Sequence, residues 1–443
     1  MTIKTKRLFK IILFIFIFFV LQYLIGWFLT NDYDRFSRSV IHNMHTKDKI
    51  ENLFLGTSHL YRGVNPLVIE EKTNQATYIL GTPGQELDGA YALLREACIF
   101  HPEIKNVYID IDYLTFQKDN IQERNSLKNY WSISDYLKVP EIKRDFLINS
   151  IPHKNYPDIL LKIGKEKISI NYKKNIKQLK FRLNGKYKKH EYDEKSELNY
   201  ITNGFIPKQY SSNDEEEEKV FFVNNSDTGF DENSICDVYL IYLDKISTYC
   251  RENRLNLVFI SCPEDITSLL AIGNYEECHN FIKDSIEQHG YSYFDFNYCK
   301  KEYLSLKPSD YYNIDHLNEM GSNKLSTIVA TVLTSNNPNQ YFYKSGIEWK
   351  NSLDKTVYGF KKIESEDKLS CAFYPVTNID NDELITYDYY FFEGKEKTLL
   401  SKQTKDYSII YPKNKKGLIE IECFLNNSFV CKTQQEFDTR WFK

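Results

Sequence analysis

Two short segments of the chain carry residue types that together can perform acyl transfer. Ser58 follows the apolar run at 52–55 within the sequence Gly-Thr-Ser, so a strand would deliver its hydroxyl into a tight turn. His316 stands in the segment Asn-Ile-Asp-His-Leu-Asn at 313–318 and directly follows Asp315. A serine hydroxyl becomes a nucleophile when an imidazole accepts its proton. The two segments therefore predict a serine nucleophile with a histidine general base.

The elements that must position these residues recur along the chain. Apolar runs typical of strands occur at 52–55, 78–80, 106–112, 255–261 and 291–296, and helical segments at 90–97, 238–251, 276–288 and 322–333 separate or follow them. Strands that alternate with helices are typical of a parallel sheet with right-handed crossovers. We expect an α/β domain with a doubly wound parallel sheet of five strands, whose carboxyl edge collects the functional residues.

The amino terminus predicts a membrane anchor. Residues 11–31 contain no charged side chain, four basic residues lie within 4–10, and Asp32 and Asp34 follow. Such a run is long enough to cross the hydrocarbon layer, and the charge bias holds the short tail in the cytoplasm and exports the rest. A cleaved signal peptide is the alternative, but its apolar core is usually shorter and ends in small residues, whereas residues 26–29 read Gly-Trp-Phe-Leu. We expect a single-pass protein of the cell membrane with an extracytoplasmic main domain.

Changes in sequence character predict three parts. Residues 1–45 form the tail, anchor and juxtamembrane segment, residues 46–335 form the α/β domain, and residues 336–443 form a β-sandwich-like accessory domain. The α/β domain carries an insertion at about 120–232. Within it, the basic segment 162–189 either binds anionic headgroups or an acidic polymer, or is a solvated helical face, and the acidic run at 214–218 predicts a mobile loop.

Composition excludes several function classes. The 443 residues carry a net charge of −4, which gives no overall basic field, so we expect no nucleic-acid partner. The nine cysteines include no C-x-x-C pair, so we expect no metal site and no cofactor, and free thiols in the core rather than a disulfide between Cys423 and Cys431. Aromatic residues make up 15% of the chain, which fits β-rich segments or ring surfaces for sugars.

Three ordered blocks resemble the membrane-anchored branch of the SGNH hydrolase-like superfamily. These blocks are GTSHLYRGVNP at 56–66, ILGTPGQ at 79–85 and HLNEMG at 316–321. The resemblance covers roughly residues 50–120 and 235–335, and the insertion and the carboxyl-terminal domain fall outside it. It implies a triad of Ser58 as nucleophile, His316 as general base and then acid, and an aspartate that orients the imidazole.

The third member of the implied triad departs from the family pattern. The family aspartate commonly stands three residues before the histidine, where this chain has Asn313. Asp315 is the favoured replacement, with Asp310 and Asn313 as alternatives. Because adjacent residues on a regular strand point to opposite faces, Asp315 can orient His316 only if this segment is irregular.

The resemblance also implies a pocket that stabilises negative charge on the reacting oxygen. Its donors would be the backbone N–H groups of Ser58 and Gly81. A third donor, an asparagine after the third strand in many relatives, is replaced here by Asp110 and Asp112, so Gln85 is the expected substitute. His59 either lines this pocket or makes a structural hydrogen bond.

Relatives with one anchor and an exported catalytic domain resemble alginate acetylation proteins and the D-alanyl transfer protein of teichoic acid synthesis. This resemblance implies an O-acyltransferase that receives an acyl group, in our expectation acetyl, from a membrane-bound O-acyltransferase and passes it to a cell-surface polysaccharide. A carbohydrate esterase with the same triad is one alternative. A non-catalytic scaffold or polymer-binding protein of a cell-envelope assembly machine is the other.

Overall fold

The computed structural model describes residues 3–29, 36–111, 120–161, 170–183, 203–208, 221–224, 229–232, 235, 237–365, 370–379, 384–411 and 415–438. The chain divides into two compact units. The first contains residues 1–207, 233–260 and 286–293, and the second contains residues 208–232, 261–285 and 294–443. The predicted Asp112 and the acidic run at 214–218 lie outside the described residues.

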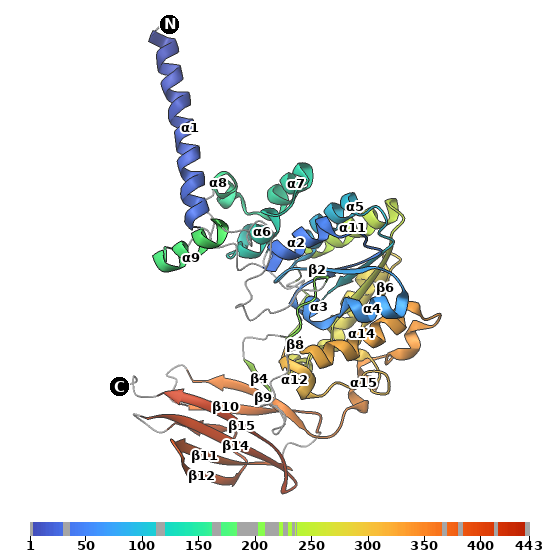
Figure 1. Ribbon diagram of the computed structural model, residues 1–443. Helices are drawn as coiled ribbons and strands as arrows, with labels where there is room; N and C mark the ends of the chain where they lie inside the picture. Colours follow the sequence, from blue (N-terminus) through green and yellow to red (C-terminus); the bar gives the residue numbers. More distant parts are fainter. Residues whose placement is uncertain are drawn as a thin grey trace. The chain divides into compact units, whose positions relative to one another are not determined.

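A five-stranded parallel sheet forms the centre of the α/β fold (Figure 1). Its strands are β1 (Asn52–Gly56), β2 (Thr77–Gly81), β3 (Asn106–Asp110), β5 (Asn256–Ser261) and β6 (Ser292–Asp295), in the order β2-β1-β3-β5-β6. β1 pairs in parallel with both β2 and β3, and β3 with β5. All five residues of β1 and of β2 are buried, as expected for strands covered on both faces. The predicted parallel α/β architecture is therefore confirmed.

Nine further α-helices belong to the described part of the first unit. They are α2 (Phe36–Thr46), α3 (Ser58–Gly63), α4 (Pro66–Thr73), α5 (Leu87–Phe100), α6 (Lys128–Ser134), α7 (Pro140–Ser150), α8 (Tyr156–Leu160), α9 (Tyr172–Leu183) and α11 (Asp237–Glu252). Helix α5 packs against β1 and lies beside α11 and α7, whereas α2, α3 and α4 pack against β2 (Figure 1).

The amino-terminal helix is α1 (Ile3–Leu29), with 27 residues. At 1.5 Å per residue it is about 40 Å long, which is enough to cross a membrane. Most of its apolar side chains are exposed, as expected if lipid rather than protein covers them. The predicted apolar helix is confirmed, and its orientation and its retention after export stay predictions.

The second unit contains helices, a short hairpin and a β-rich region. The helices α12 (Ile266–Ile272), α13 (Tyr275–Glu287), α14 (Glu319–Thr334) and α15 (Gly346–Ser352) lie wholly or mainly in it. The hairpin consists of β7 (Tyr311–Asn313) and β8 (His316–Leu317).

Two four-stranded sheets form the β-rich region. One has the order β13-β10-β9-β4 and the other β12-β11-β14-β15. The strands are β4 (Phe221–Asn224), β9 (Val357–Glu364), β10 (Ser370–Thr377), β11 (Ile385–Glu393), β12 (Glu396–Thr404), β13 (Ser408–Ile410), β14 (Lys416–Leu425) and β15 (Ser428–Asp438). Aromatic rings from both sheets, including Phe360, Phe373 and Tyr387, form one buried core. The rings of this region therefore pack chiefly against one another.

Two strand pairings in the second unit concern segments that the sequence analysis singles out. β4 comes from the predicted insertion at 120–232, yet it pairs in parallel with β9 and so extends a sheet of the carboxyl-terminal region. Cys423 and Cys431 face each other across β14 and β15 as free thiols. β4 and β9 are thus paired although they lie more than 130 residues apart in the chain, and the order of the sequence does not reveal this pairing.

Candidate functional site

Ser58 is the first residue of α3 and follows the end of β1 by two positions. Thr57 caps this helix, because its Oγ1 accepts a hydrogen bond of 3.3 Å from the backbone N–H of His59. Ser58 itself is half-buried. The buried strand and the capped helix together hold this hydroxyl at the carboxyl edge of the sheet, as the sequence predicts.

The position of β1 in the sheet favours a site at Ser58. From β1 the chain crosses to β2 on one side and then to β3 on the other, so the winding direction reverses at β1. Open α/β sheets bind ligands at the carboxyl ends of strands where this reversal occurs. Gly56 ends β1 and packs closely on the end of β3. A Cβ added to Gly56 would lie only 2.6 Å from the Cβ of Asp110, so this position has no room for a side chain.

Gly81 ends β2 beside the turn that carries Ser58. It is in parallel register with Gly56, and the backbone N–H of Thr82 donates to the Gly56 carbonyl at 3.1 Å. A Cβ on Gly81 would approach the Gly56 carbonyl oxygen to 3.1 Å and the Thr57 carbonyl oxygen to 3.3 Å. A glycine is therefore needed for the two strand ends to come together, and this brings the backbones of Gly81 and the Ser58 turn close to each other.

The sequence reasoning missed Tyr61, which lies one helical turn after Ser58. Burial raises the pKa of the Tyr61 phenol, and interactions with Arg62 and a hydrogen bond with Ser58 oppose that rise only in part. A Cβ on Gly81 would also lie 3.2 Å from the Tyr61 ring. Tyr61 thus contacts both the predicted nucleophile and the predicted oxyanion strand. Ser58 and Tyr61 are three residues apart, and this spacing on a helix places both side chains on the same face.

Gln85 and His59 lie in the segments that follow β2 and β1, and their expected roles stay predictions. The Gln85 side chain is buried, and its amide nitrogen donates to the Leu80 carbonyl at 3.1 Å and to Thr82 Oγ1 at 3.2 Å. Both amide hydrogens are therefore used within the turn after β2, so Gln85 would have to rearrange to donate to an oxyanion. His59 is half-buried, and its backbone N–H takes part in the cap of α3.

In the second unit, Asn313 fixes the imidazole of His316. Asn313 Oδ1 accepts hydrogen bonds from the backbone N–H groups of His316 at 2.9 Å and of Asp315 at 3.2 Å. The same oxygen lies 2.9 Å from His316 Nδ1. Because this oxygen can only accept, Nδ1 must carry the proton, and Nε2 of the neutral ring is then left as the basic nitrogen.

The preference for Asp315 as the residue that orients His316 is therefore corrected. Asn313, three residues before the histidine, makes the Nδ1 contact. Asp310, the other alternative, is buried and serves a different purpose: its Oδ2 accepts from Lys324 Nζ at 2.7 Å and from the backbone N–H of Lys307 at 2.8 Å. An asparagine in the third position fixes the tautomer without adding charge, as in cysteine proteases of the papain type.

His279 is paired with a buried carboxylate, and no local sequence pattern indicates this pairing. His279 Nδ1 on α13 lies 2.7 Å from Asp295 Oδ2 at the end of β6. The same carboxylate accepts from the Tyr275 hydroxyl at 2.9 Å and, through Oδ1, from Asn297 Nδ2 at 2.9 Å. The His279 ring also packs on Tyr298. These hydrogen bonds connect α13 to the turn after β6.

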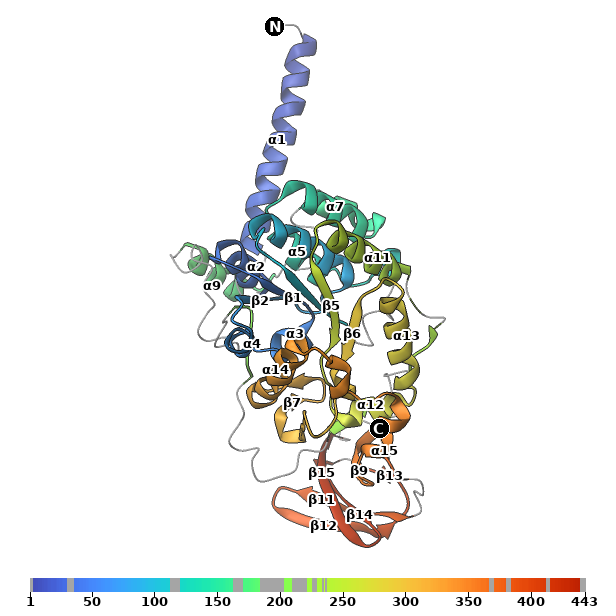
Figure 2. The same ribbon diagram turned by 90° about the vertical axis from the view of Figure 1, so that its right-hand side faces the viewer.

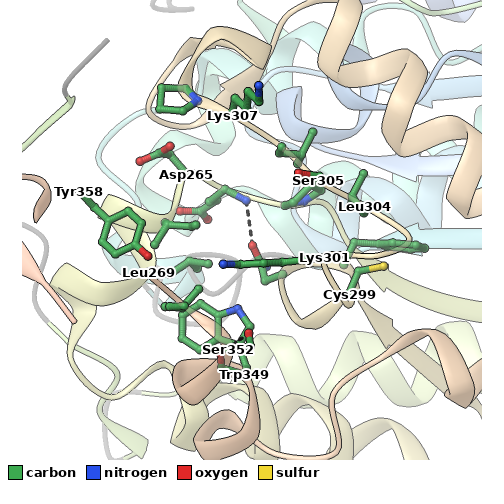
Figure 3. A pocket seen from close by; sticks show the side chains of 18 of the residues that line it. Asp265, Leu269, Cys299, Lys301, Leu304, Ser305, Lys307, Trp349, Ser352 and Tyr358 are labelled. Atoms are coloured by element: carbon green, nitrogen blue, oxygen red, sulfur yellow. Dashed lines mark hydrogen bonds between the residues drawn. The ribbon is translucent and has the colours of Figure 1, made fainter. Parts of the chain in front are cut away.

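A cavity of about 360 Å³ lies in the second unit next to the hairpin that carries His316 (Figure 3). Figure 3 shows Trp349, Tyr358 and Lys301 among the side chains around it. Tyr311, the first residue of β7, lines the cavity and donates to the Glu264 carbonyl at 2.8 Å. The volume falls within the usual range of small-molecule sites, about 300–1,000 Å³.

Polar groups lie among the apolar walls of this cavity. Asp265 is buried there, which raises the pKa of its carboxyl group, and its backbone N–H donates to the Ile314 carbonyl at 3.3 Å. Asn297 Oδ1 accepts from the backbone N–H of Glu264 at 2.8 Å. Lys301 and Asp354 form an exposed ion pair of 3.4 Å. The cavity thus joins the His316 hairpin to the network around His279 through shared wall residues.

Each unit brings together one half of the predicted site. The first holds Ser58, His59, Gly81 and Gln85 around the ends of β1 and β2, and the second holds Asn313, Asp315 and His316 in one hairpin. Among the described residues, no group of three or more His, Cys, Asp or Glu side chains has an arrangement that would hold a metal ion. The chemistry available is that of a hydroxyl, an imidazole of fixed tautomer and backbone N–H donors.

Comparisons with known proteins do not identify the chain. No family model and no curated protein matches it. Among solved structures, one similarity is to a Cellulomonas fimi endo-beta-1,4-mannanase double mutant, with 8% sequence identity over 92% of this chain and 99% of that chain. Its TM-score is 0.14, which is too low to support any statement about fold or function.

Proposed function

We propose that the protein is a membrane-anchored, extracytoplasmic serine O-acyltransferase of the SGNH hydrolase-like type, which passes an acyl group, most simply acetyl, to a cell-surface polysaccharide. The observation that carries the proposal is the contact between Asn313 Oδ1 and His316 Nδ1, which leaves Nε2 as the base. A histidine held in this tautomer is what activation of a serine requires. Ser58, at the carboxyl edge of the sheet, is the residue that it would activate.

The proposed reaction has two halves. In the first, Ser58 Oγ attacks the carbonyl carbon of the acyl donor while His316 Nε2 takes the hydroxyl proton, which then passes to the leaving group as the bond to the donor breaks. In the second, a sugar hydroxyl gives its proton to Nε2 and attacks the Ser58 ester, and Ser58 recovers the proton when it leaves. Backbone N–H groups of Ser58 and Gly81 would stabilise the oxyanion in both halves.

The proposed acceptor site is the cavity beside the His316 hairpin. Trp349, Tyr343 and Tyr358 line it and offer flat ring faces with polar edges, which match the C–H face of a pyranose ring. Polar groups in the wall, such as the buried Asp265 and the half-buried Asn297, offer partners for sugar hydroxyls. The donor would be a membrane-bound O-acyltransferase, and α1 would hold the protein at the membrane that contains it.

The experiment is an acyl-transfer assay with the full chain in detergent. The protein is incubated with 4-nitrophenyl acetate, with and without cello-, chito- and mannuronate oligosaccharides, and acylated sugar and acetate are measured separately. We expect acylated sugar from the wild type and none from the Ser58→Ala or His316→Ala variant. Acetate alone would favour the esterase. Turnover that is unchanged in Ser58→Ala, or absent from the wild type, would favour the scaffold.

A further inference from the structure

Helix α9 (Tyr172–Leu183) packs against the end of the apolar helix α1, and both belong to the first unit (Figures 1 and 2). The guanidinium of Arg182 lies 5.2 Å from the centre of the Trp27 ring, in a cation–π contact. Trp27 stands near the end of α1, where aromatic residues mark the boundary between membrane and water. If α1 crosses a membrane, this contact places α9 at the membrane surface.

The two faces of α9 differ in character. Asn175, Gln178, Phe181 and Arg182 are buried, so this face packs on the protein. Lys173, Lys177 and Lys180 are exposed and follow one another at intervals of four and three residues, which places them in one stripe on the helix. Lys174 is exposed beside this stripe. The helix therefore presents a row of cations on the surface that the protein leaves open.

Large apolar side chains are exposed at both ends of the same helix. Ile170, two residues before the helix, is 89% exposed, Tyr172 at its start is 69% exposed, and Leu183 at its end is 73% exposed. Outside α1, these are three of the four most exposed large apolar residues in the described part of the chain. Water is a poor environment for such side chains, whereas the boundary between headgroups and acyl chains can bury them.

We propose that α9 lies in the membrane interface and that Lys173, Lys177 and Lys180 bind the headgroups of anionic phospholipids. Lysines on one side and exposed apolar residues at the ends are the features of a helix that lies in the plane of a membrane. Because α9 is fixed to α1 through Trp27, it is at the right depth without any change in the protein. The lysine stripe would attract anionic lipid within a Debye length of the surface.

This inference rests on the membrane anchoring that is part of the proposed function, and it does not depend on catalysis. Lipid contacts on α9 would act as a second attachment point beside α1. Two attachment points restrict the rotation of the first unit about the axis of α1. They would therefore hold the edge that carries Ser58 at a constant orientation to the membrane that supplies the acyl donor.

The test compares two spin-labelled lipids around the full chain reconstituted in phosphatidylcholine vesicles. Electron paramagnetic resonance gives the ratio of the association constants for labelled phosphatidylglycerol and phosphatidylcholine. We expect about a threefold preference for phosphatidylglycerol in the wild type, weakened by high salt. The triple variant Lys173→Gln, Lys177→Gln, Lys180→Gln should lower the ratio clearly, and the preference that remains is expected from the basic residues at 4–10 before the apolar part of α1. A wild type without preference, or a triple variant with the wild-type ratio, would overturn the proposal.

A matched control removes the same charge elsewhere. Lys395, Lys402 and Lys405 are exposed in or near β12, and their replacement by Gln should leave the lipid ratio unchanged. The Ser58→Ala variant should also keep the wild-type ratio, which separates this inference from the catalytic proposal. Extraction of the protein from vesicles by alkaline carbonate would show that α1 is no anchor and would overturn the inference for that reason. If the triple variant keeps the wild-type lipid ratio but no longer binds an acidic polysaccharide that the wild type binds, the lysine stripe is a polymer-binding site instead.

Discussion

At the scale of single residues, Asn313 decides what His316 can do. Its Oδ1 already accepts two backbone N–H groups, so the amide cannot turn its nitrogen toward the imidazole without losing both bonds. The proton on Nδ1 is therefore fixed by the hairpin itself. Asparagine, unlike aspartate, adds no negative charge that would stabilise the imidazolium of the proposed reaction, so His316 has a fixed tautomer and a weaker electrostatic partner.

Substitutions of Asn313 test this assignment. Asn313→Asp adds a carboxylate beside the imidazole, which favours the protonated ring and raises the pKa of His316. Because the base must be neutral, the acid limb of the pH–rate profile should move to higher pH, with activity retained above it. Asn313→Ala should lower kcat/KM about tenfold to a hundredfold by freeing the tautomer. An Asn313→Asp profile identical to that of the wild type would contradict the assigned contact.

Gly81 allows a second prediction at this scale. The Gly81→Ala variant adds a Cβ that would stand 3.1 Å from the Gly56 carbonyl oxygen and 3.2 Å from the Tyr61 ring, so the ends of β1 and β2 must separate. We expect kcat to fall about tenfold or more and the free energy of unfolding to fall by about 1–3 kcal/mol. Full kcat in a variant with a lowered melting temperature would show that Gly81 is needed for packing alone.

At the scale of elements, buried polar contacts join helices that the sequence shows only as separate segments. Glu96 on α5 is fully buried, and its Oε1 lies 2.9 Å from His45 Nε2 on α2. The same carboxylate accepts from the backbone N–H groups of Lys138 at 2.6 Å and Val139 at 3.2 Å, just before α7. One side chain thus holds three elements together.

The Glu96→Gln variant tests that role through its pH dependence. Burial alone would raise the pKa of Glu96, but the hydrogen bonds from His45, Lys138 and Val139 outweigh it, so the folded pKa lies below 4.5. The charged form therefore stabilises the fold above pH 4.5, and this contribution is lost as the pH falls through the folded pKa. We expect the variant to be less stable by about 1–3 kcal/mol at pH 7, and this difference to shrink in acid, as measured by thermal unfolding. A stability difference between wild type and variant that stays constant from pH 7 into acid would contradict the assigned role of Glu96.

The aromatic wall of the cavity in the second unit gives another prediction at the scale of elements. Tyr358 on β9 is half-buried and faces the cavity in Figure 3. If the cavity binds the acceptor sugar, Tyr358→Ala should raise the acceptor KM about tenfold and leave acylation by 4-nitrophenyl acetate unchanged. Tyr374→Ala, at an exposed position of β10, is the matched control. An unchanged acceptor KM in Tyr358→Ala would place the acceptor elsewhere.

At the scale of the whole molecule, local patterns predicted the elements well and the distant pairings poorly. The apolar runs at 52–55, 78–80 and 255–261 became β1, β2 and β5 with shifts of one residue, because a buried parallel strand leaves a continuous apolar run. The pairing of β4 with β9 and the contact of His279 with Asp295 join residues far apart in the chain. No local pattern encodes such contacts, which depend on the packing of whole elements. The choice between Asn313 and Asp315 likewise depended on the backbone of a three-residue turn.

The central claim is that Ser58 and His316, from the two units, act on one acyl group. Labelling of the full chain with a fluorophosphonate probe, followed by peptide mass spectrometry, tests it most directly, because such probes react with a serine that a histidine activates. We predict one adduct, on Ser58, and a labelling rate about a hundredfold or more lower in the His316→Ala variant. An adduct on another residue, or labelling of Ser58 at the same rate without His316, would contradict the account.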